Sequence, residues 1–449
     1  MTLKFGTDGV RGVANRELTP ELAMGLGRAA ARVLGGGRWL VGRDTRISGP
    51  LLAAALSAGL ASEGVEVADL GVLPTPGVAY VAAREGVAAA MISASHNPFP
   101  DNGIKLFAAG GLKLGDDVEA RVEAELTALA VAGDPRPRPE GGAVGTVRRY
   151  DEGARGYFTH LTTAALEGRS LDGVRVVVDA ANGAASAFAG DVLSALGADV
   201  TVINAAPDGC NINVDCGSTH PEALRTAVLA AGADVGLALD GDADRVLAVD
   251  ASGSVVDGDQ IIGICAIDLH RRGRLTNDTV VVTVMSNLGF RHGMAAAGIR
   301  VLDTAVGDRY VLEELDRSGS SLGGEQSGHV IFRDLSTTGD GMLTGIMLLD
   351  VMAREATPVA DLAADAMTRL PQVMVNVGLP RRDPGVIDSV AAYVLSAEEQ
   401  LGGRGRVLLR ASGTEPLVRV MVEAPTDEEA AAIADELADA VRKAVGSRP

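Results

Sequence analysis

Three aspartates in the segment DGDADR give the sequence its strongest chemical signal. Asp240, Asp242 and Asp244 alternate with Gly241 and Ala243, and apolar runs stand on both sides of the segment. The small residues allow the backbone to curl, so that the three carboxylates can turn toward one point. Such crowding raises carboxylate pKa values unless a cation compensates, and ligands that are all oxygen suit a hard ion such as Mg²⁺. The segment therefore predicts a metal loop, with a solvated acidic turn as the alternative.

A second polar cluster follows the apolar segment at 87–93, which is predicted to be a buried strand. The sequence continues there as ASHNP, with Ser95 and His96 side by side. A serine in such a loop can act as a nucleophile that carries a covalent group. Taken alone, the cluster also fits a polar turn, because Ser, Asn and Pro are ordinary turn formers.

Two further segments suit the recognition of a phosphate and of a sugar. RASGTEPLVR supplies two guanidinium groups, two hydroxyls and a glycine that permits close backbone approach, namely Arg410, Arg419, Ser412, Thr414 and Gly413. A turn between two strands is the alternative reading of this segment. In GGEQSGH, the alternating side chains of Glu325, Ser327 and His329 would face one way in an extended segment and could bond successive sugar hydroxyls.

Composition limits the classes of partner. The chain has 449 residues and a formal net charge of -19, so it is expected to repel nucleic acid and anionic membrane surfaces. We find neither an apolar leader segment nor an uninterrupted apolar run of membrane-spanning length, which predicts a cytoplasmic protein. Three cysteines, Cys210, Cys216 and Cys265, are too few for a disulfide framework and are expected to be reduced thiols.

The elements that must position these clusters alternate between strands and helices. Strands are predicted at 38–44, 65–72 and 87–93, and a helix capped by Thr19 with Pro20 at its first position ends near Gly35. A stretch rich in Pro and Gly at 133–142 interrupts the alternation and places a domain boundary near residue 150. Two more α/β segments follow, and the last segment reads as a smaller α+β domain that ends in a helix. Each polar cluster lies at or near the end of a strand, where open α/β sheets bind ligands.

Several separated motifs, taken together, resemble one protein family. SASHNP, DGDADR, GGEQSGH and RASGTEP occur in this order across nearly the whole chain and resemble the motifs of the α-D-phosphohexomutases. Within that superfamily, the segments FGTDGVRG, CGSTHPE and VGDRYV, together with Gln326, look like those of the bacterial phosphoglucosamine mutases. This resemblance implies three similar α/β domains with mixed sheets plus a smaller C-terminal α+β domain, arranged around a central cleft. The expected limits are 1–150, 151–255, 256–368 and 369–449.

The resemblance also implies a reaction. Such enzymes interconvert glucosamine 6-phosphate and glucosamine 1-phosphate through a phosphoserine, here Ser95, and a 1,6-bisphosphate, in support of amino-sugar nucleotide and cell-wall precursor synthesis. Mg²⁺ is expected on Ser95 and the three aspartates, and catalytic glucosamine or glucose 1,6-bisphosphate is expected as activator. His96 is assigned to shaping the loop.

The remaining site residues receive roles in the same way. Arg11, Lys105 and Arg245 are expected to neutralise charge during phosphoryl transfer. Lys105 and His329 are the candidate general bases, but each also fits a simpler role, as a phosphate counter-charge and as a hydrogen-bond donor respectively. Substrate binding is assigned to Gly307, Asp308, Glu325, Ser327, Arg410, Ser412, Gly413, Thr414 and Arg419.

Other functions remain open at this point. A phosphomannomutase or phosphoglucomutase would use the same parts, and a metal-dependent phosphatase would also need the aspartate cluster. A noncatalytic sugar-phosphate binding protein would keep the two arginines but would need no aspartate cluster. The expected partner is a small amino-sugar phosphate, and the sequence leaves a homodimer open.

Overall fold

The computed structural model describes residues 9–130, 136–381, 384–411 and 416–446. The chain divides into two compact units. One comprises Met1–Met285 with Gly298–Ala364, and the other comprises Ser286–Ala297 with Asp365–Pro449.

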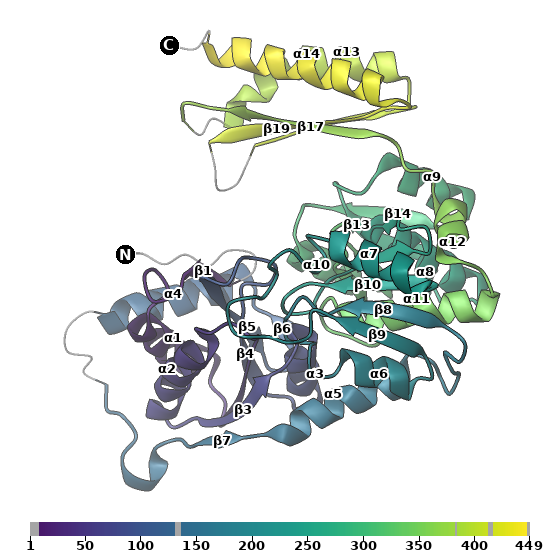
Figure 1. The fold of residues 1–449 in the computed structure, drawn as a ribbon. Helices are drawn as coiled ribbons and strands as arrows, with labels where there is room; N and C mark the ends of the chain where they lie inside the picture. The colour runs from purple at the N-terminus through teal and green to yellow at the C-terminus, as the bar shows by residue number, and fades with distance from the viewer. Residues whose placement is uncertain (1–8, 131–135, 382–383, 412–415, 447–449) are drawn as a thin grey trace. The chain divides into compact units, whose positions relative to one another are not determined.

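The first sheet of the larger unit has the strand order β1-β5-β4-β2-β3-β7, and β6 pairs with β5 (Figure 1). Its strands β2, β3, β4 and β7 run parallel, whereas β1, β5 and β6 join by antiparallel pairing. Helices α1, α2 and α4 pack a common apolar core against one face of the sheet. The strands are β1 (Val10–Val13), β2 (Arg38–Arg43), β3 (Glu66–Val72), β4 (Ala88–Ile92), β5 (Asp101–Ala108), β6 (Leu112–Lys113) and β7 (Val147–Arg149). The helices are α1 (Pro20–Leu34), α2 (Gly49–Ser62), α3 (Thr75–Glu85), α4 (Asp116–Ala130) and α5 (Asp151–Ala164).

Helix α1 shows how local sequence sets an element's limits. Thr19 accepts a hydrogen bond from the Leu22 backbone N–H at 3.3 Å, and Pro20 occupies the first helical position. Gly35 ends the helix with a φ of 67°, a conformation that glycine adopts without steric penalty. The predicted start and end of this helix are therefore confirmed.

The second sheet has the order β12-β11-β10-β8-β9. Strands β8, β9 and β10 are parallel, and β11 and β12 return antiparallel, so that β10 and β11 form the hairpin around DGDADR. The elements are β8 (Arg175–Asp179), α6 (Ala189–Ala195), β9 (Asp199–Ile203), α7 (Glu222–Ala231), β10 (Val235–Leu239), β11 (Val246–Asp250) and β12 (Val255–Val256).

The third sheet has the order β14-β13-β15-β16, with β16 antiparallel to β15 and the others parallel. Its elements are α8 (Gly258–Arg271), β13 (Thr279–Thr283), β14 (Arg300–Thr304), α10 (Asp308–Ser318), β15 (Leu322–Gly324), β16 (Val330–Phe332), α11 (Gly341–Glu355) and α12 (Val359–Ala366). Asp257 caps α8 through a reciprocal pair of hydrogen bonds with Gln260.

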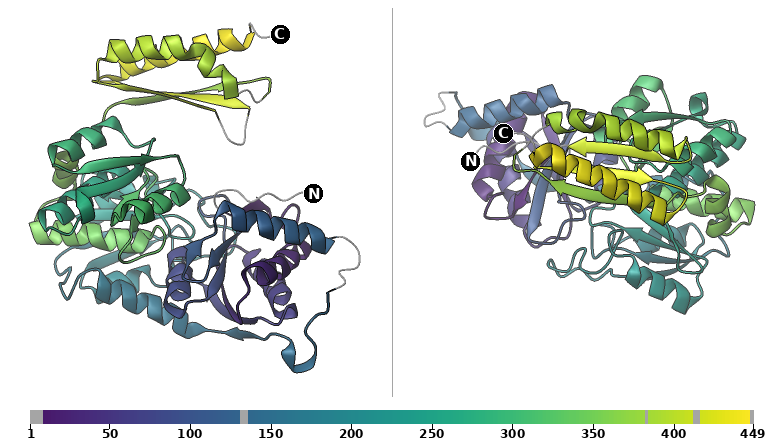
Figure 2. Two further views of the ribbon diagram at one scale, coloured as in Figure 1. Left: turned by 180° about the vertical axis from the view of Figure 1, so that it is seen from behind. Right: turned by 90° about the horizontal axis from the view of Figure 1, so that it is seen from above.

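The smaller unit contains an antiparallel sheet of order β17-β19-β18, with α13 and α14 packed in one apolar core on one face of the sheet (Figure 2). Its elements are α9 (Leu288–Ala296), β17 (Gln372–Gly378), α13 (Ala391–Leu401), β18 (Arg406–Ala411), β19 (Leu417–Glu423) and α14 (Asp427–Gly446). Three α/β segments with mixed sheets and a smaller α+β segment are thus present, which confirms the predicted fold class.

The cysteines and the hydropathy of the helices bear on two expectations from composition. Cys210, Cys216 and Cys265 form no disulfide. Over the ranges that the structure describes, no helix has both the length and the apolar character that a membrane crossing requires.

Candidate active site

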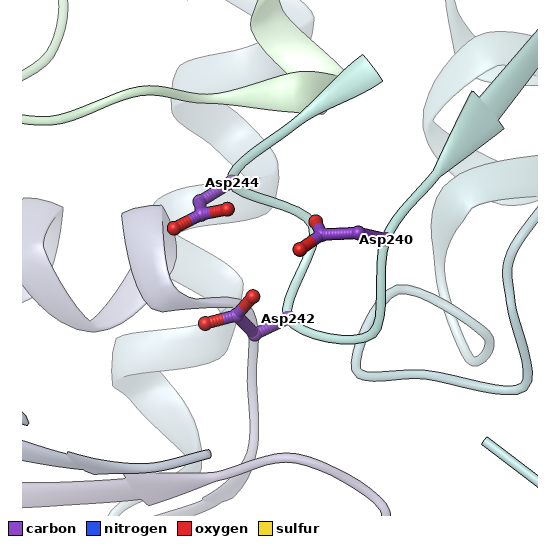
Figure 3. Close-up of side chains that lie close together, drawn as sticks. All are labelled: Asp240, Asp242 and Asp244. Atoms are coloured by element: carbon purple, nitrogen blue, oxygen red, sulfur yellow. The ribbon is translucent and has the colours of Figure 1, made fainter. Parts of the chain in front are cut away.

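The aspartate triad lies in the turn between β10 and β11, and its three carboxylates point toward a common space (Figure 3). Ala243 adopts a left-handed φ of 55°, which produces the predicted curl of the backbone. All three side chains are buried, and one oxygen atom of each lies within 4.8 Å of the others. Within the described part of the chain, the buried Oδ1 atoms of Asp242 and Asp244 accept no hydrogen bond. The triad therefore offers a metal ion an all-oxygen site with unused ligand atoms.

Two carboxyl groups of the triad have pKa values that are shifted in opposite directions, because their neighbours differ. Burial, together with repulsion from Asp244 and Asp242, raises the pKa of Asp240 well above its usual value. Burial also acts to raise the pKa of Asp244, but the positive charges of Lys105, His329 and Arg245 outweigh burial and hold it well below its usual value. A divalent ion would favour the ionised form of every member of the triad.

Two side chains from the first α/β segment contact the triad. Lys105 on β5 places its Nζ atom 2.8 Å from Asp242 Oδ2 and 3.4 Å from Asp244 Oδ2. Thr75, at the start of α3, donates its hydroxyl to Asp242 Oδ2 at 2.5 Å. The ion pairs give Lys105 the position of a counter-charge to the carboxylates.

Ser95 lies in the loop beyond β4 and faces the same triad. Its hydroxyl donates to Asp240 Oδ2 at 2.6 Å, although 145 residues separate the two in sequence. The residue is buried and has a left-handed φ of 53°. That conformation costs a residue other than glycine about 1 to 3 kcal/mol, so surrounding contacts must hold it in place. The structure thus brings the predicted nucleophile and the predicted metal loop together.

Arg245 and Arg11 form the cationic side of the site, next to His96. Arg245 donates its backbone N–H to Asp240 Oδ1 at 3.2 Å and its Nη1–H to His96 Nδ1 at 3.2 Å. Burial and the nearby charges of Arg245 and Arg11 lower the pKa of His96. An imidazole that accepts a hydrogen bond at Nδ1 and is held neutral fits the assigned role of shaping the loop.

His329 is buried between two acidic groups. Its Nδ1 atom lies 3.7 Å from Asp244 Oδ2, and its Nε2 atom lies 3.6 Å from Asp308 Oδ2. Burial acts to lower the pKa of His329, but the two carboxylates outweigh burial and raise it. The backbone N–H of Gly339 donates to Nε2 at 3.0 Å, a bond that requires an unprotonated Nε2 and opposes this shift. At Nε2, therefore, His329 is an acceptor, whereas its Nδ1 atom faces Asp244.

The segment from Glu325 to His329 is a tight turn between β15 and β16. The Glu325 N–H bonds to the His329 carbonyl at 2.9 Å, and Gly328 has a φ of 90°. The expectation that Glu325, Ser327 and His329 face one way along an extended segment is wrong, because the chain reverses there. Ser327 is exposed, whereas His329 is buried.

Glu325 connects two of the predicted substrate-binding segments. Its Oε1 atom accepts a hydrogen bond from the backbone N–H of Gly307 at 3.1 Å, which places the turn beside the start of α10. The next residue, Asp308, forms an ion pair with Lys113 of β6. Glu325, Gly307 and Asp308 are therefore brought together at one end of the third sheet.

The predicted phosphate-binding segment belongs to the smaller unit. Arg410 on β18 and Arg419 on β19 are directly opposite each other in the antiparallel register. Burial and the charge of Arg419 lower the pKa of Arg410. Ser412, Gly413 and Thr414 lie outside the described residues.

The segment from Ser93 to Pro98, which follows β4, is called the serine loop. Sequence analysis missed several polar residues in and around this loop and the triad. Asp44 and Arg46 follow β2, Thr75 follows β3, and Asn213 lies in a loop of the second α/β segment. The signal for Asp44, Arg46 and Thr75 was their position after parallel strands, since the carboxyl ends of such strands share one edge of the sheet. Asn213 carried no comparable signal in the sequence.

Comparison with known proteins decides the family. The chain is 54% identical to a phosphoglucosamine mutase of Symbiobacterium thermophilum over 450 aligned positions, which cover 98% of this chain and 99% of the relative. It is 56% identical to a phosphoglucosamine mutase of Rhodococcus jostii, with 97% and 98% of the two chains covered. The chain belongs to the phosphoglucosamine mutase family.

Further comparisons agree with this family at the level of domains and fold. Family models described as phosphoglucomutase/phosphomannomutase alpha/beta/alpha domains I, II and III match residues 2–131, 155–253 and 257–370, and the C-terminal domain model matches 359–440. A phosphoglucomutase/phosphomannomutase family protein from Burkholderia thailandensis is 26% identical, with a TM-score of 0.81 over 99% of this chain and 98% of that one. In this phosphoglucosamine mutase family member, Ser95 and the triad fall under two different domain models.

Proposed function

We propose that this chain is an isomerase that interconverts glucosamine 6-phosphate and glucosamine 1-phosphate. Relatives that are 54% and 56% identical over nearly the whole chain are phosphoglucosamine mutases, and this observation carries the proposal. The contact between the Ser95 hydroxyl and Asp240 supports it, because a phosphate carrier and a cation site are both needed beside the substrate.

The residues present fit Mg²⁺. Asp240, Asp242 and Asp244 would hold the ion with carboxylate oxygens, two of which are buried without a hydrogen bond in the described ranges. A phosphate on Ser95 would add an oxygen ligand from the adjoining loop. When bound, the ion withdraws negative charge from the transferring phosphoryl group.

The first half-reaction proceeds from phosphorylated Ser95. A sugar hydroxyl attacks the phosphorus atom, the new P–O bond forms, and the bond between phosphorus and Ser95 Oγ breaks. The proton of the sugar hydroxyl passes to a general base, and Arg11 and Arg245 lie on the cationic side that balances the phosphoryl charge. In the second half-reaction, Ser95 Oγ attacks the phosphorus atom of the other phosphate of the sugar 1,6-bisphosphate, and the bond between that phosphorus and the sugar oxygen breaks. The general base returns its proton to this oxygen, and the phosphorylated enzyme is restored.

Of the two candidate bases, we favour Lys105. His329 Nε2 already accepts the Gly339 N–H, whereas Lys105 lies on the strand that runs beside the serine loop. Lys105 serves as counter-charge in its ammonium form; once the substrate displaces its ion pairs it releases a proton to solvent, and the neutral amine then accepts the proton of the sugar hydroxyl.

The substrate is held at two places in this proposal. Glu325, Ser327, Gly307 and Asp308 contact the sugar, and Arg410, Ser412, Gly413, Thr414 and Arg419 hold the phosphate that is not reacting. The hydrogen bond from the Gly307 backbone N–H to Glu325 Oε1 supports the first group. The opposed arginines support the second, since two guanidinium groups suit one phosphate.

The experiment that tests the proposal supplies purified protein with Mg²⁺, a trace of glucose 1,6-bisphosphate and one sugar phosphate at a time. Glucosamine 6-phosphate should be converted to the 1-phosphate faster than glucose 6-phosphate or mannose 6-phosphate. Preferred turnover of glucose or mannose phosphate would instead identify a phosphoglucomutase or phosphomannomutase. Release of one inorganic phosphate per substrate would indicate a phosphatase, and binding without conversion would indicate a sugar-phosphate binding protein.

A further inference from the structure

A short segment after β2 contacts the serine loop from inside the protein. Asp44 and Arg46 are both buried, and Arg46 Nε pairs with Asp44 Oδ2 at 2.9 Å. The Arg46 guanidinium also donates to three backbone carbonyls of the serine loop, at 2.8 Å to Ser95, 2.8 Å to Asn97 and 2.6 Å to Pro98. A single side chain therefore satisfies carbonyls on both sides of His96.

Asp44 reaches the same loop by a second route. Ser93 donates its hydroxyl to Asp44 Oδ2 at 2.7 Å and accepts the backbone N–H of Ser95 at 2.9 Å. The N–H and C=O groups of Ser95 are thus both fixed by the Asp44 and Arg46 pair. Because Ser95 has a left-handed φ, fixing both of its peptide groups is what keeps its hydroxyl directed at Asp240.

The segment is attached to the second α/β segment as well. Thr45 donates its hydroxyl to the Asn182 carbonyl at 2.6 Å, and the Ile47 N–H donates to the Gly209 carbonyl at 2.8 Å. Residues 44 and 46 therefore contact the serine loop, whereas residues 45 and 47 contact loops around the second sheet, which carries the triad.

Asn213, in the second α/β segment, also donates hydrogen bonds to the serine loop. Its Nδ2 atom donates to the Ser95 carbonyl at 2.9 Å and to the Asn97 carbonyl at 3.1 Å, two of the groups that Arg46 also contacts. A carbonyl oxygen has two lone pairs, so both donors can bind it at once. The serine loop is held in this way from both sides of the site.

We infer that Arg46 is a positioning residue, which acts with Asp44 and Asn213 to hold the Ser95 hydroxyl within hydrogen-bonding distance of the aspartate triad. The inference rests on the proposed function, because it gives these buried groups a purpose only if Ser95 carries the transferred phosphoryl group. Arg46 touches neither the triad nor the position of the reacting oxygen, so its effect is transmitted through the backbone of the loop. A displacement of about 1 Å at a reacting group can lower the rate by about a hundredfold.

The principal test compares Arg46→Lys with Arg28→Lys. Arg28 is a matched control, since it also forms a buried ion pair in the same α/β segment, with Glu63 at 2.8 Å, and lies on α1 away from the serine loop. Lysine at position 46 keeps the charge opposite Asp44, but its three N–H donors on one nitrogen cannot reproduce the bond to Asp44 and the three carbonyl bonds at once. We expect kcat to fall about 30- to 100-fold and KM for glucosamine 6-phosphate to change less than about threefold. Arg28→Lys should lose thermal stability without this loss of kcat.

A second measurement follows hydrogen exchange in the serine loop itself. Hydrogen exchange of a peptide that contains Ser95 and Asn97 should be faster in Arg46→Lys than in wild type, and unchanged in Arg28→Lys. Should Arg46→Lys not fold, Asn213→Ala tests the same contacts from the other side, with faster exchange and lower kcat expected.

The outcomes separate the two proposals. Equal kcat in Arg46→Lys, Arg28→Lys and wild type, with unchanged exchange at the serine loop, would overturn the positioning role while leaving the function intact. An inactive wild type would overturn the proposed function, and the exchange data would then still show whether Arg46 fixes the loop. A fall in kcat shared equally by both variants would mean a general structural effect and would also overturn the inference.

Discussion

Ser95 is held by polar contacts and contributes little apolar packing. Its hydroxyl bonds to Asp240, and its peptide groups bond to Ser93 and Arg46. Ser95→Ala should therefore abolish isomerisation and leave the folded state nearly as stable, because the variant removes a phosphate acceptor and only the polar contacts of one hydroxyl, with Asp240 and His96.

Product analysis and thermal unfolding check this expectation, with the exposed loop variant Ser252→Ala as control. Intact-mass measurement should show a phosphate on part of the wild type and none on Ser95→Ala. Turnover by Ser95→Ala within threefold of wild type would rule out the phosphoserine mechanism.

Asp242 contributes one formal charge to a buried cluster. Asp242→Asn should weaken Mg²⁺ binding at least about tenfold, which corresponds to about 1.4 kcal/mol, and should lower turnover. Titration calorimetry with MgCl₂ on chelator-treated protein measures the affinity directly. Asp278→Asn, which changes a carboxylate with 63% side-chain exposure, should bind Mg²⁺ as the wild type does. Equal affinity in all three proteins would remove the triad from the metal site.

Motif residues were predictable one by one because their types carry chemistry, whereas their supporting partners were not. DGDADR showed that carboxylates would converge, and the structure places them within 4.8 Å. The position of Arg46 after a parallel strand indicated an edge of the sheet, but not which carbonyls, 49 to 52 residues away, it would bind. Such contacts depend on which strands become neighbours, and side-chain pattern alone does not fix that choice.

At the scale of elements, helix limits followed from local hydrogen bonding. The Thr19 hydroxyl satisfies one of the free N–H groups at the start of α1. Thr19→Ala should destabilise the protein by about 1 kcal/mol without altering turnover. Denaturant unfolding gives the loss of stability, and Thr226→Ala, within the exposed face of α7, is the control. A smaller effect at position 19 than at position 226 would contradict the cap.

The turn between β15 and β16 shows where element prediction failed. Alternating polar residues suggested an extended segment, but Gly328 reverses the chain with a φ of 90°. Glycine has access to such values, and a single one was not enough to distinguish a turn from a strand.

This turn carries the residue on which sugar selectivity is expected to depend. Glu325→Gln removes a charge that can pair with the substrate's 2-ammonium group, a contact worth about 1.5 to 3 kcal/mol. We expect kcat/KM for glucosamine 6-phosphate to fall about tenfold or more, and that for glucose 6-phosphate to fall less. Kinetic measurements with both sugars test this expectation, and Glu399→Gln, at an exposed position of α13, is the control. An equal loss for both sugars would mean that Glu325 binds a hydroxyl that they share.

At the scale of the whole molecule, the sequence predicted the number and type of segments but not every long-range association. The predicted limit of the last segment at 369 stays a proposal. The smaller unit also includes α9, where the Leu288 N–H donates to Glu423 Oε2 at 2.9 Å and Asn287 contacts the Leu370 carbonyl at 3.0 Å. A sequence analysis that divides the chain into contiguous segments could not find this association, because it joins residues more than 80 positions apart.

The smaller unit carries two arginines opposite each other on adjacent strands, where burial and the charge of Arg419 lower the pKa of Arg410. Like charges directly across an antiparallel pair repel, by about 0.2 to 1 kcal/mol. Arg419→Gln should therefore raise the melting temperature slightly in phosphate-free buffer.

In the wild type, inorganic phosphate should stabilise the folded state by binding both guanidinium groups, and Arg419→Gln should lose most of that gain. Calorimetry of the full chain at increasing phosphate concentration measures both effects, with Arg442→Gln on the exposed face of α14 as the matched control. If phosphate stabilises Arg419→Gln as strongly as it stabilises the wild type and the control, the opposed arginines are not the anion site.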